Sequence, residues 1–182
     1  MRKICCITIL MLSVLALLSC GANAGDVDQK YIRKALSLAR QAMQQGNEPF
    51  GAVLVKDGRI IMQAGNTIHT DDNVTHHAET NLLAKAYRKL GIKAAIGSTI
   101  YSSCEPCAMC CGAIYLFKIK RLVYGLSAPR LSALSGWKME FPSRKFFQAA
   151  QAEIQITGPV LEEESLEVFR EYFKKHPLKR HK

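Results

Sequence analysis

The sequence predicts an α/β fold in which one mixed sheet is covered by helices on both faces. Segments with apolar residues at helical spacing alternate with short β-rich runs, and two of these runs are joined by a tight turn. Alternation of this kind places helices on both faces of a sheet, and the tight turn adds an antiparallel pair. The chain has 182 residues and no repeat or internal linker, so we expect a single folded domain.

The first half of the chain contains a helix, a hairpin and a second helix. The first helix is predicted over residues 31–43, where apolar residues recur at spacings of four, three and four. Runs 51–55 and 59–62 flank Asp57-Gly58, and an Asp-Gly pair supplies the positive φ angles of a hairpin turn. The second helix is predicted over residues 77–90, where Gly91 ends it.

The second half continues the alternation. Residues 129–142 are ambiguous and are interpreted as one helix with a long loop. The last helix opens with three glutamates, which suit the positive end of a helix dipole. The other predicted elements are strand 99–102, helix 107–117, strand 121–124, strand 153–157 and helix 162–174.

The first 24 residues have the pattern of a signal peptide. Arg2 and Lys3 precede an apolar run over residues 4–18, which is too short for a comfortable membrane span and ends in small residues. Cleavage after Ala24 is favoured over lipidation at Cys20, and an uncleaved anchor is the third alternative. The expected product is an exported domain over residues 25–182, without a stable membrane span.

The chain is basic, with a formal net charge of +10. Loss of the predicted signal peptide removes Arg2 and Lys3 and no acidic residue, so the mature chain stays basic. This excess favours nucleic acid, anionic surfaces or phosphorylated small molecules as partners and does not indicate a fold. The sharpest cluster is the C-terminal tail from about residue 174, which we interpret as a solvated end in preference to a nucleic-acid contact.

The cysteines of the mature domain indicate a metal site. Three of the seven cysteines lie in the predicted signal peptide, and the other four lie within residues 104–111. Clustered cysteines separated by two residues are typical of metal binding, whereas a disulfide framework spreads its cysteines along the chain.

Two short motifs supply three metal ligands and one additional carboxylate. His77 and Glu79 are separated by one residue, and Cys107 and Cys110 follow Pro106 at the start of a predicted helix, on one face of it. One histidine and two thiolates suit zinc, and three protein ligands leave the fourth tetrahedral position to water. Glu79 is poorly placed as a co-ligand and well placed to carry protons for that water.

A closed structural site is the main competing interpretation. Cys104 could join His77, Cys107 and Cys110 to complete a tetrahedron, which would make the chain a non-catalytic, zinc-stabilised interaction module. That arrangement leaves Glu79 without a role. Cys111 falls on another helix face and is expected to be a small buried hydrophobe.

These motifs give the chain its resemblance to a known family. The pattern H-x-E followed by P-C-x-x-C is typical of zinc deaminases. Residues 35–173 resemble the cytidine and deoxycytidylate deaminase superfamily, on the branch that holds bacterial guanine deaminases and tRNA adenosine deaminases. The matching segments are PFGA at 49–52, GN at 65–66, THHAE at 75–79 and SCEPCAMCCGAI at 103–114.

The resemblance implies a three-layer α/β/α fold with a mixed five-stranded sheet, and often a homodimer. It implies one Zn²⁺ ion per chain, held by His77, Cys107 and Cys110, with Glu79 carrying protons between water, base and leaving ammonia. It also implies three substrate-binding residues: Asn66, which would hydrogen-bond the substrate, Phe50, which would line or stack against the base, and Ala52.

The substrate is less sharply defined. Guanine deaminases have an acidic residue near position 130, where this chain has Arg130, and this difference counts against guanine. Export favours a small molecule, so the expected substrate is guanine, adenine, cytosine or one of their nucleosides. The alternative is an adenosine in tRNA or single-stranded nucleic acid, which the basic charge favours.

Overall fold

The computed structural model describes residues 23–137 and 141–176 of the chain. The predicted signal peptide up to residue 22, with Cys20, and the basic tail from residue 177 lie outside the described residues. Within the described part of the chain, no helix combines the length and the apolar character needed to cross a membrane.

The centre of the fold is a mixed sheet of five strands in the order β2-β1-β3-β4-β5. β1 pairs antiparallel with β2 and β3, whereas β4 pairs parallel with β3 and β5, which confirms the mixed sheet and the predicted hairpin. The strands are β1 Gly51–Lys56, β2 Arg59–Gly65, β3 Thr99–Cys104, β4 Arg121–Leu126 and β5 Gln155–Thr157.

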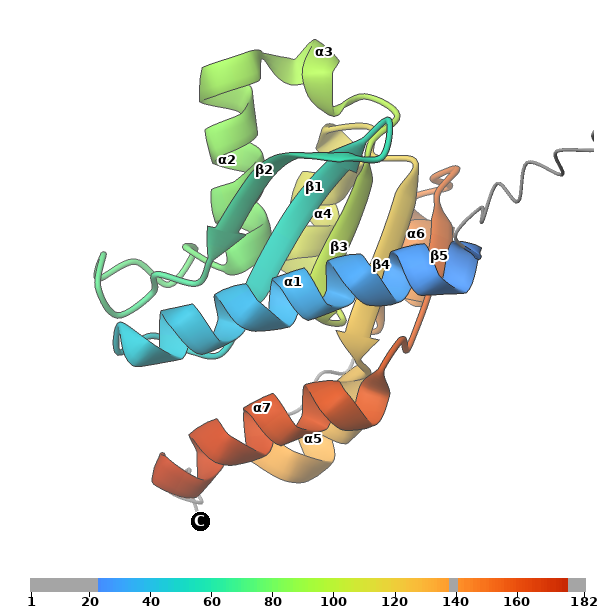
Figure 1. Ribbon diagram of the computed structural model, residues 1–182. Helices are drawn as coiled ribbons and strands as arrows, with labels where there is room; N and C mark the ends of the chain where they lie inside the picture. The colour runs from blue at the N-terminus through green and yellow to red at the C-terminus, as the bar shows by residue number, and fades with distance from the viewer. Residues whose placement is uncertain (1–22, 138–140, 177–182) are drawn as a thin grey trace, which may run out of the picture.

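Helices cover both faces of this sheet, as predicted (Figure 1). On one face lie α1 (Ala24–Gln44) and α7 (Glu162–Lys175), which pack against each other and the sheet. On the other face lie α2 (Ala78–Leu90), α4 (Ala108–Leu116) and α6 (Ser143–Ala149). Two short helices, α3 (Ile92–Ala95) and α5 (Ala128–Ser135), complete the connections.

Side-chain alternation along the central strands divides the core in two. Successive residues of a strand point to opposite faces, so one set packs under α1 and α7 and the next under α2 and α4. The first set includes Val53, Tyr101 and Val123, and the second includes Leu54, Ile100 and Leu122.

Gly51 allows α1 to lie very close to the start of β1. A Cβ atom at this position would come within 2.2 Å of the Ala35 carbonyl oxygen and 2.6 Å of the Ala39 nitrogen. Any larger residue would therefore push the helix off the strand. Phe50, directly before Gly51, is thereby held at one end of the sheet.

A partly buried ion pair that sequence reasoning did not find joins the two halves of the fold. Arg121 of β4 donates hydrogen bonds of 2.7 and 2.6 Å to the two carboxylate oxygens of Asp28 in α1. The Tyr101 hydroxyl of β3 donates to Asp28 at 3.0 Å, and Arg121 also donates to the Thr157 hydroxyl of β5 at 3.1 Å. This network therefore links α1 to β3, β4 and β5.

The region after β4 differs from the sequence prediction. One helix with a long loop was expected over residues 129–142, and α5, which ends at Ser135, is that helix; the additional helix α6, which begins at Ser143, was not predicted. The Glu105 carboxylate accepts hydrogen bonds of 3.0 Å from the backbone N–H groups of both Ala128 and Ser143. It thereby satisfies a backbone donor at the start of each helix.

The edge strand and the first helix also differ in length from their predictions. β5 covers residues 155–157 rather than 153–157, and it pairs only with β4. α1 begins at Ala24, seven residues before the predicted start of that helix.

Candidate metal centre and active site

The predicted metal ligands lie at the starts of two neighbouring helices. His77 is the N-cap residue of α2, Cys107 is the N-cap residue of α4, and Cys110 lies one turn into α4. α2 and α4 pack against each other on the same face of the sheet. The positive ends of both helix dipoles therefore point toward the ligand atoms, which favours thiolates.

Asn81 of α2 holds the loop that presents His77. Its side-chain amide donates to the Thr67 hydroxyl at 2.8 Å and to the Gly65 carbonyl at 3.1 Å. The end of β2 and the start of the loop are thereby attached to the first turn of α2. His77 follows this loop directly.

The three ligand atoms have the spacing of a tetrahedral zinc site. His77 Nδ1 lies 3.7 Å from Cys107 Sγ and 3.6 Å from Cys110 Sγ, and the two sulfur atoms are 3.7 Å apart. With Zn–S bonds of about 2.3 Å, tetrahedral geometry separates two sulfur ligands by about 3.8 Å. Among the described residues, these three form the one group of this kind whose ligand atoms converge.

The charges of the ligands also suit a metal ion. Hydrogen bonds with Cys110 and His77 lower the pKa of Cys107 to about 4, so this residue is a thiolate at neutral pH. The contact with Cys107 raises the pKa of His77 in turn. The pKa of Cys110 is raised, because its proton is shared with the Cys107 thiolate and because it is buried. Metal binding to both sulfurs would release that proton.

Glu79 lies beside the ligands in the first turn of α2, and its side chain is almost fully buried. Its Oε1 atom accepts a 2.6 Å hydrogen bond from the Ser102 hydroxyl of β3, and its Oε2 atom lies 3.4 Å from Cys110 Sγ. Burial raises the pKa of Glu79. A raised pKa favours proton uptake by this carboxyl group, as a role in proton transfer requires.

A small cavity of about 120 Å³ opens onto this group. Drug-sized ligands occupy cavities of about 300 Å³ or more, so the space suits one small ring. The cavity is lined by two metal ligands, three carboxylates, two aromatic rings and one leucine: His77, Cys107, Glu48, Glu79, Glu105, Phe50, Trp137 and Leu131.

Helix α7 supports the aromatic part of the cavity wall. The rings of Phe50 and Trp137 are nearly parallel, at 17°, with centroids 6.4 Å apart. Phe50 packs edge-on against Phe169, and Trp137 packs edge-on against Phe173. Both supporting rings belong to α7, so this helix orients the two walls.

The three residues expected to bind substrate occupy different positions. Phe50 lines the cavity. Asn66 is nearly fully buried and does not line it, but its amide group donates to the Glu48 carboxylate at 3.4 Å. Ala52 is fully buried in the core beneath α2 and does not line the cavity. Substrate contact by these residues stays a prediction.

Sequence reasoning missed several residues of the cavity, namely Glu48, Glu105, Leu131 and Trp137. Glu48 and Glu105 adjoin recognised motifs, and this adjacency is a signal that could have identified them. Leu131 and Trp137 follow β4 in the ambiguous region, where no periodic pattern marks them. Only the packing of α5 and α7 brings these two residues to the cavity.

The alternative closed site with Cys104 is not formed. Cys104 packs in the core beneath α1 and α7, and its sulfur is not part of the converging ligand group. Burial raises the pKa of the Cys104 thiol, which keeps it protonated. Cys111 is fully buried, as expected for a small hydrophobe.

Arg130 points away from the cavity. Its guanidinium group forms ion pairs of 2.6 Å with Glu163 and 3.7 Å with Glu162 at the start of α7. The neighbouring Leu131 lines the cavity instead. Arg130 therefore forms ion pairs at the surface, between α5 and α7.

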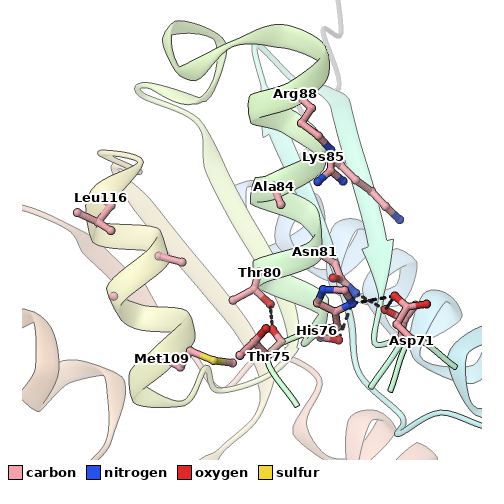
Figure 2. A pocket seen from close by; sticks show the side chains of 13 residues that line it. Asp71, Thr75, His76, Thr80, Asn81, Ala84, Lys85, Arg88, Met109 and Leu116 are labelled. Atoms are coloured by element: carbon pink, nitrogen blue, oxygen red, sulfur yellow. Dashed lines mark hydrogen bonds and ion pairs between the residues drawn. The ribbon is translucent and has the colours of Figure 1, made fainter. Parts of the chain in front are cut away.

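A second, larger hollow of about 660 Å³ lies between α2 and α4 (Figure 2). Thr80, Ala84 and Arg88 border it from α2, and Met109 and Leu116 border it from α4. It shares no lining residue with the metal cavity.

Comparison with known proteins agrees with this site. The family described as "Cytidine and deoxycytidylate deaminase zinc-binding region" matches residues 26–126, a span that includes His77, Glu79, Cys107 and Cys110. The chain therefore belongs to the cytidine and deoxycytidylate deaminase family, whose members are zinc-dependent hydrolases that act on C–N bonds. The family match and the deaminase relatives together show that the chain is a zinc-dependent deaminase.

Individual relatives differ in what they act on. The chain is 38% identical to a probable cytosine deaminase of Schizosaccharomyces pombe, over 80% of this chain and 92% of that protein. It is 37% identical to the tRNA-specific adenosine deaminase of Bacillus subtilis, over 75% and 83% of the two chains. A solved structure from a study of tRNA:A34 deaminases superimposes with a TM-score of 0.65 at 33% identity, covering 76% of this chain and 98% of that one.

Proposed function

We propose that this deaminase acts hydrolytically on a free nucleobase or a nucleoside, such as guanine, adenine, cytosine or their nucleosides, and releases ammonia. The observation that supports a small substrate is the cavity of about 120 Å³ beside the metal ligands, with Phe50 and Trp137 as aromatic walls. A small planar base fits a space of this size and character.

The roles of the residues follow from their positions. His77, Cys107 and Cys110 would hold the zinc ion, which, when bound, lowers the pKa of a water molecule to about 7. Glu79 takes one proton from water and passes it to the ring nitrogen as the water oxygen bonds to the carbon that carries the amine. It then takes the second proton from that oxygen and passes it to the amine, which leaves as ammonia when the C–N bond breaks. The Ser102 hydrogen bond to Oε1 orients the carboxyl group of Glu79, so that Oε2 is the oxygen that moves the proton. Phe50 contacts the base, with Asn66 and Ala52 behind the cavity wall.

The direct test measures ammonia release by the zinc-loaded protein from guanine, adenine, cytosine, their nucleosides and tRNA. Glu79→Gln should retain zinc, because Glu79 is not a ligand, and should lower kcat at least about 100-fold. Zinc content and melting temperature serve as controls for folding. Full activity of Glu79→Gln on every substrate would contradict the mechanism.

RNA is the second candidate substrate. Its support is the 37% identity to a tRNA-specific adenosine deaminase together with the net charge of +10. Under this alternative, ammonia release from tRNA would exceed release from every base and nucleoside in the panel. RNA affinity would also fall steeply with salt, because basic side chains displace counterions from phosphates.

We also propose that the protein forms a homodimer through α2 and α4. Large apolar side chains are exposed on these two helices, and the hollow of Figure 2 lies between them. The apolar residues are Tyr87, Leu90, Met109, Tyr115 and Leu116. Exposed apolar side chains on two neighbouring helices favour a two-fold contact with a second copy.

We further propose that residues 1–24 export the protein. The support is the basic start, the short apolar run and the small residues before Gly25. N-terminal sequencing of the exported protein should begin at Gly25. A lipid-modified N-terminus at Cys20 would show anchoring instead, and an intact Met1 would contradict export by cleavage.

A further inference from the structure

The geometry points to Glu48 as the residue that selects a free nucleobase over its nucleoside. We infer that its carboxylate accepts a hydrogen bond from the ring N–H that becomes the glycosidic nitrogen in a nucleoside. The inference rests on the proposed function, since it concerns the same cavity, and it names the substrate class within it.

Glu48 lines the metal cavity from the segment just before β1, together with Phe50. Its side-chain carboxylate accepts one hydrogen bond from the described residues, from the Asn66 amide to Oε2 at 3.4 Å. No lysine or arginine of the described chain forms an ion pair with it. The carboxylate of this cavity-lining residue therefore retains free acceptor positions.

Burial makes an unpaired acceptor of this kind unfavourable unless a bound ligand supplies a donor. Glu48 is half-buried, and desolvation raises its pKa against the opposing effects of His77 and His69. A half-buried acceptor that has no donor loses hydrogen bonds to water and gains none from the protein. A substrate N–H group would supply the missing hydrogen bond.

Asn66 orients this carboxylate. The Asn66 side-chain oxygen accepts a 3.0 Å hydrogen bond from the Ile68 backbone N–H, while its amide group donates to Glu48. The residue is nearly fully buried, so its own orientation is constrained by packing. Asn66 is thus a positioning residue for Glu48.

The chemistry of the bases explains the selection. The amino group that leaves must lie at the metal ligands and Glu79. Free cytosine also carries an N–H at N1, and free purines carry one in the imidazole ring; in a nucleoside the sugar replaces the hydrogen at this nitrogen. A carboxylate only accepts hydrogen bonds, so a nucleoside would leave Glu48 unpaired and would place the sugar against it.

The experiment compares bases with their nucleosides, using the zinc-loaded full chain. For wild type we expect kcat/KM for the preferred free base to exceed that for its nucleoside by at least about 10-fold. Glu48→Gln should lower kcat/KM for the base by about 10- to 100-fold and reduce the preference. Glu153→Gln, at an exposed carboxylate on the same protein, should change neither value.

A binding measurement separates this inference from the activity itself. Trp137 is the only tryptophan of the chain and lines the cavity, so its fluorescence reports occupancy. Wild type should bind uracil at least about 10-fold more tightly than 1-methyluracil, and hypoxanthine more tightly than 9-methylhypoxanthine. Glu48→Gln should remove most of this difference, while Glu48→Asp should keep part of it.

The outcomes are distinguishable. If no compound is deaminated but the methylated bases bind more weakly than the free bases in a Glu48-dependent manner, the proposed function fails and the role of Glu48 stands. If bases and nucleosides are turned over equally, or if methylation does not change affinity in wild type, the role of Glu48 is overturned. The wild-type comparisons need no variant, so they hold even if Glu48→Gln does not fold.

Discussion

At the scale of single residues, two adjacent buried cysteines have different neighbours. Cys110 Sγ lies 3.6 Å from His77 Nδ1 and belongs to the converging ligand group, whereas Cys111 Sγ lies 3.5 Å from the Pro106 carbonyl and is enclosed by core side chains. Burial raises the pKa of the Cys111 thiol, so this residue stays neutral. One residue of helical rotation thus separates a metal ligand from a core residue.

This difference predicts unlike effects of two similar substitutions. Cys110→Ser should abolish stoichiometric zinc binding, because a hydroxyl group is a poor replacement for a thiolate ligand. Cys111→Ala should keep one zinc ion per chain and cost about 1 kcal/mol of unfolding free energy. Zinc content by atomic absorption and denaturant unfolding measure the two quantities. Equal zinc loss in both variants would contradict the assignment of ligands.

At the scale of helices and strands, Glu105 connects two helix starts to the cavity wall. It follows β3, is almost fully buried, and accepts hydrogen bonds from the Ala128 N–H, the Ser143 N–H and, at 2.6 Å, the Ser143 hydroxyl. Trp137 and Leu131 lie on the chain between these two anchor points. Glu105 therefore positions the part of the wall that α5 and the segment after it supply.

The network predicts a specific defect for Glu105→Gln. The substitution places an amide donor opposite donors, so it should cost about 2 kcal/mol of unfolding free energy. We expect KM to rise more than kcat falls, and the Trp137 emission to shift to longer wavelength as this part of the wall becomes more exposed. Glu167→Gln, at an exposed carboxylate of α7, is the control. An unshifted Trp137 spectrum with unchanged KM would show that Glu105 does not position the wall.

Most helices and strands could be predicted from the sequence, and the reasons differ from one element to the next. The hairpin of β1 and β2 is a local structure, because the Asp57-Gly58 turn and the β-rich runs are adjacent in the chain. The separation of α5 from α6 is not local. It depends on Glu105, which is 38 residues away from Ser143 and gives no periodic signal.

At the scale of the whole molecule, α2 and α4, which begin at the converging ligands, also carry large exposed apolar side chains. Leu116 is 68% exposed, and Tyr87 is 58% exposed. Their helices begin with the ligands His77 and Cys107, so a partner that packs on them would contact the elements that hold the metal. Dimer formation and metal binding would then stabilise the same pair of helices.

A charge in this surface should separate the two copies. Leu116→Glu is expected to convert the dimer to a monomer, because a carboxylate buried in an apolar contact is strongly unfavourable. Sedimentation velocity measures the change, and zinc content confirms that the fold is retained. Ile92→Glu, at an exposed apolar residue of α3, should leave the assembly unchanged. A wild-type protein that is monomeric at micromolar concentration would contradict the proposed dimer.

The sequence by itself identified the three residues whose ligand atoms converge, the adjacent carboxylate of Glu79 and the order of most elements. These features depend on residue type and on spacing within one helix or one turn, which the sequence displays directly. The tertiary structure decided which other side chains reach the cavity. It excluded Cys104, turned Arg130 toward α7, and brought Glu48 and Trp137 to the metal centre. Such contacts join segments that are far apart in the chain. They depend on packing and burial, which leave no periodic pattern in the sequence.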